Sequence, residues 1–130
     1  MKTLFAALCS AFIANAARAG EFSYFCMVNS VYRQSEDNGS LQEYAGMGVK
    51  AGDKFAVDRR TGTVTGERVP AFNARRFDVL GDGKNGNSFK VVFSGQNGYL
   101  GYLAIAEYKA GKSKPFILDD SIWVATGICE

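Results

Sequence analysis

Five arginines lie in one short stretch of the chain, and their side chains suit the binding of anions. A guanidinium group presents a planar fork of N–H donors that matches a phosphate or a carboxylate. Within residues 59–76, Glu67 is the one acid that opposes them. The spacing predicts a patch for an anionic partner, such as a phosphorylated lipid headgroup, a cell-wall polymer or an acidic protein surface. The alternative is a solvated hairpin face whose arginines pair with acids elsewhere. The five residues are Arg59, Arg60, Arg68, Arg75 and Arg76.

Catalytic chemistry is restricted because the chain contains no histidine. This removes the commonest general base and metal ligand, together with every Ser–His or Cys–His nucleophile pair. Asp82, Asp119 and Asp120 are oxygen donors of the kind that bind calcium, but an EF-hand loop needs a ligand at the position that Lys84 occupies. We therefore expect no catalytic residues, no metal and no cofactor, and a protein that is not an enzyme.

The N-terminus predicts a secretory signal peptide over residues 1–19. Lys2 precedes an apolar run at 4–14, and Ala17-Arg18-Ala19 supplies the small-x-small cleavage pattern. The run is too short to span a bilayer. We expect a single mature domain, residues 20–130, that is periplasmic or secreted and has no transmembrane segment. It has lost Lys2 and Arg18, so 13 basic residues face 13 acidic ones, which argues against nucleic-acid binding.

Two cysteines remain in that domain, Cys26 and Cys129. An even count in an exported chain predicts one disulfide, which would tie the first strand to the last residues. Two cysteines without histidine do not form a zinc site. They also lack the Cys-x-x-Cys context of a redox pair, so we expect a structural bridge.

The elements that carry these residues are predicted to be short β-strands. Apolar residues alternate over 22–28, 89–93 and 122–128, as in half-buried strands. Asn97-Gly98 and Arg60-Thr61-Gly62 are turn signals between such runs. The pattern predicts an all-β fold, a meander of about seven to eight strands in a small antiparallel barrel or sandwich. The terminal bridge favours the barrel. Gln42–Lys50 is expected to form a short helical turn, which Gly46 and Gly48 weaken.

One motif resembles a known group of proteins. Phe55-Ala56-Val57-Asp58-Arg59-Arg60-Thr61-Gly62 and the closing Gly127-Ile128-Cys129 are similar to small secreted bacterial β-proteins with an FxVDRxTG hairpin and a C-terminal GxC close. The resemblance spans most of the mature chain. It implies export and a β fold, and it brings no activity with it. The alternative interpretation of the hairpin is structural, with Asp58 and Thr61 bonding to nearby backbone.

Two functions follow as hypotheses. The first is an exported, non-enzymatic binding module, expected to be a monomer, that acts on a protein or a cell-envelope component, for example as an inhibitor. The arginine stretch and the loop 81–87 are its predicted binding regions, because loops on rigid sheets usually carry function. The second is a lipocalin-like carrier with a small apolar ligand inside the barrel. Its lining would come from aromatic residues, namely Tyr24, Phe25, Tyr32, Phe72, Tyr99, Tyr102, Tyr108 and Trp123.

Overall fold

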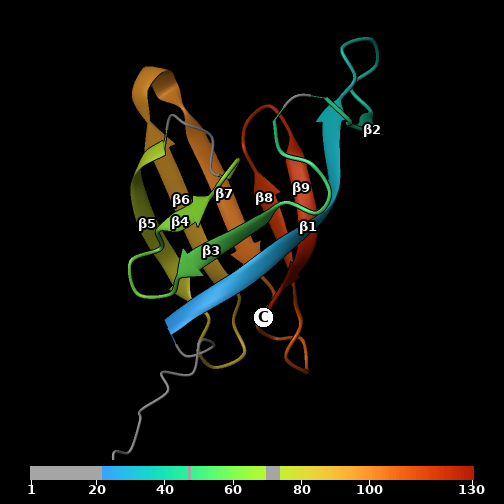
Figure 1. The fold of residues 1–130 in the computed structure, drawn as a ribbon. Helices are drawn as coiled ribbons and strands as arrows, with labels where there is room; N and C mark the ends of the chain where they lie inside the picture. The colour runs from blue at the N-terminus through green and yellow to red at the C-terminus, as the bar shows by residue number, and fades with distance from the viewer. Residues whose placement is uncertain (1–21, 47, 70–73) are drawn as a thin grey trace, which may run out of the picture.

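A computed structural model describes residues 22–46, 48–69 and 74–130, and almost all of its regular structure is β-strand (Figure 1). The predicted signal peptide, 1–19, lies outside the described residues. The strands are β1 (Ser23–Gln34), β2 (Leu41–Glu43), β3 (Lys54–Asp58), β4 (Val64–Gly66), β5 (Ala74–Asp82), β6 (Phe89–Gly95), β7 (Leu100–Ile105), β8 (Lys114–Asp119) and β9 (Val124–Cys129).

All strand pairs are antiparallel, and the sheet runs in the order β4-β3-β1-β9-β8-β7-β6-β5, with β2 added to the far end of β1. The sheet curls into a nearly closed barrel (Figure 1). The barrel closes where the two ends of the strand order, β4 and β5, approach each other. There, a Cβ placed on Gly62 would lie 2.7 Å from Cγ2 of Val91 and 2.9 Å from Cγ2 of Val79. The β3–β4 hairpin therefore packs directly on β5 and β6. The all-β prediction is confirmed. Of the two predicted architectures, the structure is a nearly closed barrel and not a sandwich.

The period-two pattern places alternate side chains inside the barrel. Along β6, Phe89, Val91 and Phe93 are buried, whereas Lys90 between them is exposed. The buried rings contact one another: the ring centroids of Tyr24 and Phe89 lie 5.2 Å apart. The other close pairs are Phe55–Phe116 at 5.1 Å, Phe77–Phe93 at 6.0 Å and Phe93–Tyr99 at 6.3 Å. Aromatic side chains thus form much of the core, at separations that favour tilted and edge-to-face contacts.

The predicted disulfide between Cys26 and Cys129 is present. The two residues lie opposite each other on β1 and β9, and both are buried. Next to them, Phe25 and Glu130 exchange two backbone hydrogen bonds, of 2.8 and 2.9 Å. The bridge therefore joins the first and last strands where they are already paired, near one end of the barrel.

The turns follow the sequence signals in one place and depart from them in another. Between β6 and β7, a 3-10 turn over Gln96–Gly98 has Asn97 at φ 57° and Gly98 at φ 73°, conformations that asparagine and glycine tolerate best. The helical turn predicted over Gln42–Lys50 is wrong. Leu41–Glu43 forms β2 instead, paired with the exposed end of the 12-residue β1. The hairpin between β1 and β2 has overridden a weak helical preference, as is common for short segments.

Candidate binding surface

The FxVDRxTG motif forms the tight turn between β3 and β4. The Asp58 carboxylate accepts hydrogen bonds from the backbone N–H groups of Arg60 (2.8 Å) and Thr61 (2.9 Å). The Gly62 N–H donates to the Asp58 carbonyl at 2.8 Å, and Gly62 has φ 76°. These bonds lower the pKa of Asp58. The structural interpretation of this motif is therefore confirmed: Asp58 holds the turn through its own backbone neighbours.

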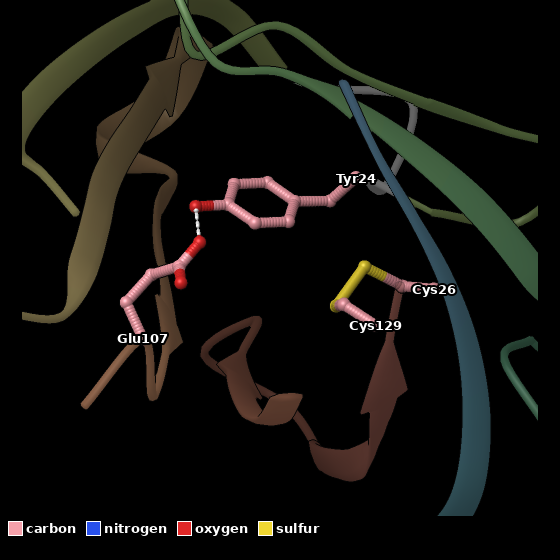
Figure 2. The surroundings of a disulfide bond; sticks show 4 residues. All are labelled: Tyr24, Cys26, Glu107 and Cys129. Atoms are coloured by element: carbon pink, nitrogen blue, oxygen red, sulfur yellow. Dashed lines mark hydrogen bonds between the residues drawn. A yellow bond between two sulfur atoms is a disulfide. The ribbon is translucent and has the colours of Figure 1, made fainter. Parts of the chain in front are cut away.

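Arg59 leaves this turn toward the end of the barrel, where it joins a small polar cluster. Its guanidinium carbon lies 4.7 Å from the centre of the Tyr24 ring, and its Nη2 lies 3.5 Å from Oε1 of Glu107. The Tyr24 hydroxyl donates to the same Glu107 oxygen, and Figure 2 shows this bond beside the disulfide. Lys114 Nζ lies 3.8 Å from the other oxygen, Oε2. One largely buried carboxylate thus binds two cations and a phenol.

This Tyr24–Glu107 cluster is suited to closing the barrel end. Burial raises the pKa of the Tyr24 phenol above its ordinary value, and the hydrogen bond to Glu107 raises it further. The phenol stays protonated and keeps donating to the carboxylate. A buried carboxylate is stable only when its lone pairs are occupied, and here three side chains from separate elements occupy them. Arg59 is therefore committed to an internal contact.

Arg68 is held in a second ion pair, at the opposite end of the β3–β4 hairpin. Its Nε and Nη2 donate to the two carboxylate oxygens of Asp53 at 2.9 and 3.0 Å. The Lys50 backbone N–H donates to Asp53 Oδ2 at 2.9 Å. The hydrogen bond from Arg68 is the main cause that lowers the pKa of Asp53. The pair anchors the chain that follows β4 to the chain that precedes β3.

The remaining three arginines are exposed, one in the β3–β4 turn and two on β5. Arg76, on β5, pairs with Asp78 on the same strand, with Nε 2.9 Å from Oδ2. Its neighbour Arg75 donates to the Ala74 carbonyl at 3.1 Å. Arg60 lies at the β3–β4 turn. Strand register therefore distributes the five arginines over both ends of the hairpin and the start of β5, and at least three pair with acids. Anion binding by this set stays a prediction.

The predicted loop 81–87 is shorter in the structure: Gly81 and Asp82 end β5, where they pair with β6, and residues 83–87 form a polar turn. Asp82 accepts from the Lys84 backbone N–H at 3.0 Å, and Asn85 has φ 57°. Lys84 Nζ lies 3.5 Å from Asp82 Oδ2, and both side chains are largely exposed. The loop therefore satisfies its own charges locally.

An exposed apolar patch lies on the outer face of the sheet, where sequence reasoning proposed no site. Phe25 is 54% exposed, Met27 is 44% and Ile117 is 46%. The strand register brings these side chains together. Met27 on β1 pairs with Ile128 on β9, and Ile128 pairs with Pro115 on β8. Pro115 is two residues from Ile117 on the same strand. The patch thus runs across β1, β9 and β8. Alternation along β1 was the available signal, because Tyr24, Cys26 and Val28 inside require Phe25 and Met27 outside.

Two open hollows adjoin this patch along β3. The apolar hollow, of about 420 Å³, is lined by Phe25, Cys26, Lys54, Phe55, Ala56 and Thr65. The cationic hollow, of about 440 Å³, is lined by Lys50, Ala51, Gly52, Asp53, Lys54, Glu67 and Arg68. Lys54 lines both, so the two hollows meet at this side chain. We call these hollows together the β3 surface. It includes one predicted site residue, Arg68, and adds Lys50, Lys54 and Phe25.

Two of the aromatic residues proposed to line an internal cavity are more than half exposed instead. Phe25 belongs to the β3 surface, and Tyr108 is 62% exposed beyond β7. Tyr24 and Trp123 are buried as expected. Phe72 lies outside the described residues. The inner and outer rings alternate along the strands, so a single aromatic lining could not include them all.

Across 22–46, 48–69 and 74–130, no three His, Cys, Asp or Glu side chains come together as a metal site would require. In the same part of the chain, no helix has the length and apolar character needed to cross a bilayer.

Comparisons with known proteins return no relative. No family model, no curated protein and no solved structure matches this chain. The resemblance of the FxVDRxTG hairpin to small secreted bacterial β-proteins therefore stays a prediction.

Proposed function

We propose that this protein is an exported, non-enzymatic binding module that takes a protein or cell-envelope partner on the outer face of β1 and β3. One observation carries the proposal: exposed apolar side chains, Phe25 and Met27, adjoin a hollow lined by cationic side chains. Exposed apolar groups that gather in one patch beside polar groups are typical of interaction sites.

Two further features support a rigid binding module in an oxidising compartment. The disulfide joins the terminal strands, and such bridges persist mainly outside the cytoplasm. The apolar hollow is lined by the paired strands β1, β3 and β4, and the Arg68–Asp53 ion pair ties together the two segments that line the cationic hollow. The side chains of the β3 surface therefore hold a defined spacing before a partner arrives. Such preorganisation reduces the entropy lost on binding.

An outer site is favoured over the interior site of the carrier hypothesis. Inside the barrel, the rings of Tyr24, Phe89 and Phe93 are buried and contact other rings. A small apolar ligand held there would have to displace them. The β3 surface needs no such rearrangement, because its hollows already open to solvent.

The test places a photoreactive amino acid at position 25 in cells that export the protein, and at Leu80 as the control. Leu80 is 66% exposed on β5 and lines neither hollow of the β3 surface. We expect an adduct of one discrete mass from position 25 and none from position 80. The adduct should disappear when Lys54→Glu is added to the same chain. Adducts at both positions, at neither, or unaffected by Lys54→Glu would contradict the proposal.

A further inference from the structure

We propose that the β3 surface binds an extended peptide segment in which an apolar side chain and a carboxylate lie two residues apart. This inference rests on the proposed function and specifies the partner. It is carried by the position of Lys54, which lines both the apolar and the cationic hollow.

The apolar hollow is shaped to bind one side chain of the partner. Phe25 and Ala56 are directly opposite each other on β1 and β3, and Ala56 is opposite Thr65 on β4. A large residue, a small one and a short polar one in a row leave a depression over Ala56. Phe25 forms one wall with more than half of its surface exposed. Filling this depression would bury the ring, and such buried aromatic contacts carry much of the energy in interfaces.

The cationic hollow carries charge that the protein itself does not neutralise. Asp53 is already bound by Arg68 and by the Lys50 backbone N–H. Among the described residues, neither Lys50 nor Lys54 has a carboxylate within ion-pair distance. With Asp53 and Arg68 committed to each other, two lysines face one acid, Glu67, in this hollow. Complementarity calls for an anionic group beside the two lysines.

The exposed Glu67 is the acid that opposes such a ligand. It lines the cationic hollow. Removing its charge should therefore strengthen the attraction for a carboxylate. This direction distinguishes charge complementarity from binding by apolar contact alone, since apolar contact would be indifferent to Glu67.

The spacing between the two halves favours an extended peptide. Lys54 and Ala56 lie two residues apart on β3 and point to the same outer face. That repeat is about 6.6 Å, and an extended segment presents its own alternate side chains at the same repeat. An apolar residue over Ala56 and a carboxylate beside Lys54 are thus matched by residues i and i+2 of a partner segment.

The experiment titrates ¹⁵N-labelled, disulfide-bonded protein with three synthetic octapeptides of Ser, Thr and Gly. The first carries Phe and Asp two residues apart, the second replaces Asp by Asn, and the third replaces Phe by Ala. We expect the first to bind and to move the amide signals of Phe25, Lys54 and Thr65. The other two should each bind about tenfold more weakly, as the loss of one charge-assisted contact or one buried ring implies.

Variants connect the preference to the proposed residues. Lys54→Gln should abolish the preference for Asp over Asn, and Glu67→Gln should enlarge it. Lys112→Gln is the matched control, because Lys112 is exposed in the turn between β7 and β8. A Lys54→Gln protein that keeps the full preference would overturn the assignment of the carboxylate to Lys54.

The remaining outcomes separate this inference from the proposed function. Equal binding of the Asp and Asn peptides would overturn the carboxylate requirement and leave a binding surface. Binding of phosphatidylglycerol vesicles but of no peptide, with loss on Phe25→Glu, would replace the peptide by a membrane and again leave the surface. Unmoved amide signals at Phe25 and Lys54 with every probe would overturn this inference. The photocrosslinking result would then decide the proposed function separately.

Discussion

Removing the disulfide should bring the protein close to its unfolding threshold. The bridge closes a loop with a sequence separation of 103 residues. In the chain-entropy model, a loop of that length removes freedom from the unfolded chain worth about 4.7 kcal/mol at 25 °C. The perturbation is the double substitution Cys26→Ala/Cys129→Ala, which deletes the cross-link and two buried sulfur atoms. If each sulfur counts as a buried methylene, the substitutions add roughly 1 kcal/mol apiece.

The total, about 7 kcal/mol, is comparable with the whole stability of many domains, which is about 5–15 kcal/mol. The assay is urea unfolding of the oxidised protein and of the double variant, monitored by Trp123 fluorescence. Val28→Ala is the control, because Val28 is buried on the same strand and its truncation leaves the bridge intact. We expect the control to lose about 1–3 kcal/mol. The double variant should lose far more.

A loss of less than about 2 kcal/mol in the double variant would refute this reasoning. It would mean that the unfolded chain without the bridge still keeps its ends close together through residual structure, such as pairing of β1 with β9. In the folded protein these strands pair at six positions, from Cys26↔Cys129 to Tyr32↔Val124. A loss equal to that of Val28→Ala would assign the effect to packing alone.

Three further predictions concern the turn, the core and the polar cluster. Asp58→Ala removes the acceptor for two backbone N–H groups, one of them from Thr61, and should cost about 1–2 kcal/mol in urea unfolding, whereas Asp58→Asn should restore part of it. Gly127→Ala places a Cβ 2.0 Å from the Met27 carbonyl oxygen, so we expect a loss of more than about 3 kcal/mol or no folded protein by circular dichroism. The pKa of Tyr24 is raised in the folded state, so its contribution is complete below pH 10 and falls as pH rises beyond it. Tyr24→Phe should therefore weaken the decrease in unfolding free energy between pH 9 and 11.5, and an unchanged slope would contradict the assignment.

Local sequence patterns predicted the parts of this molecule that depend on near neighbours. Asp58-Arg59-Arg60-Thr61-Gly62 forms its turn through bonds that span at most four residues, so its structural role was visible in the sequence. Alternation along 24–28 and 89–93 placed the inner side chains correctly, whereas Phe22, at the start of the same pattern, is 61% exposed. The helical turn expected over Gln42–Lys50 was wrong because the exposed end of β1 offered that segment a strand partner.

The β3 surface was not predictable in the same way. Phe25 and Ala56 are neighbours only because β1 pairs with β3, and Lys50 and Arg68 meet only through Asp53 and the hairpin between them. The arginine stretch shows the reverse effect. Residues close in sequence were separated, because a hairpin and a new strand carry them to different ends.

The sequence by itself determined that the chain is an all-β protein without histidine chemistry, and that Cys26 would pair with Cys129, since no other cysteine follows the predicted leader. These follow from composition and from a two-residue period, which are local properties. Only the tertiary structure decided that Tyr24 would meet Glu107, 83 residues away, and that Lys54 would join an apolar hollow to a cationic one. Such contacts depend on strand order and register, which are set by how the whole barrel buries its side chains.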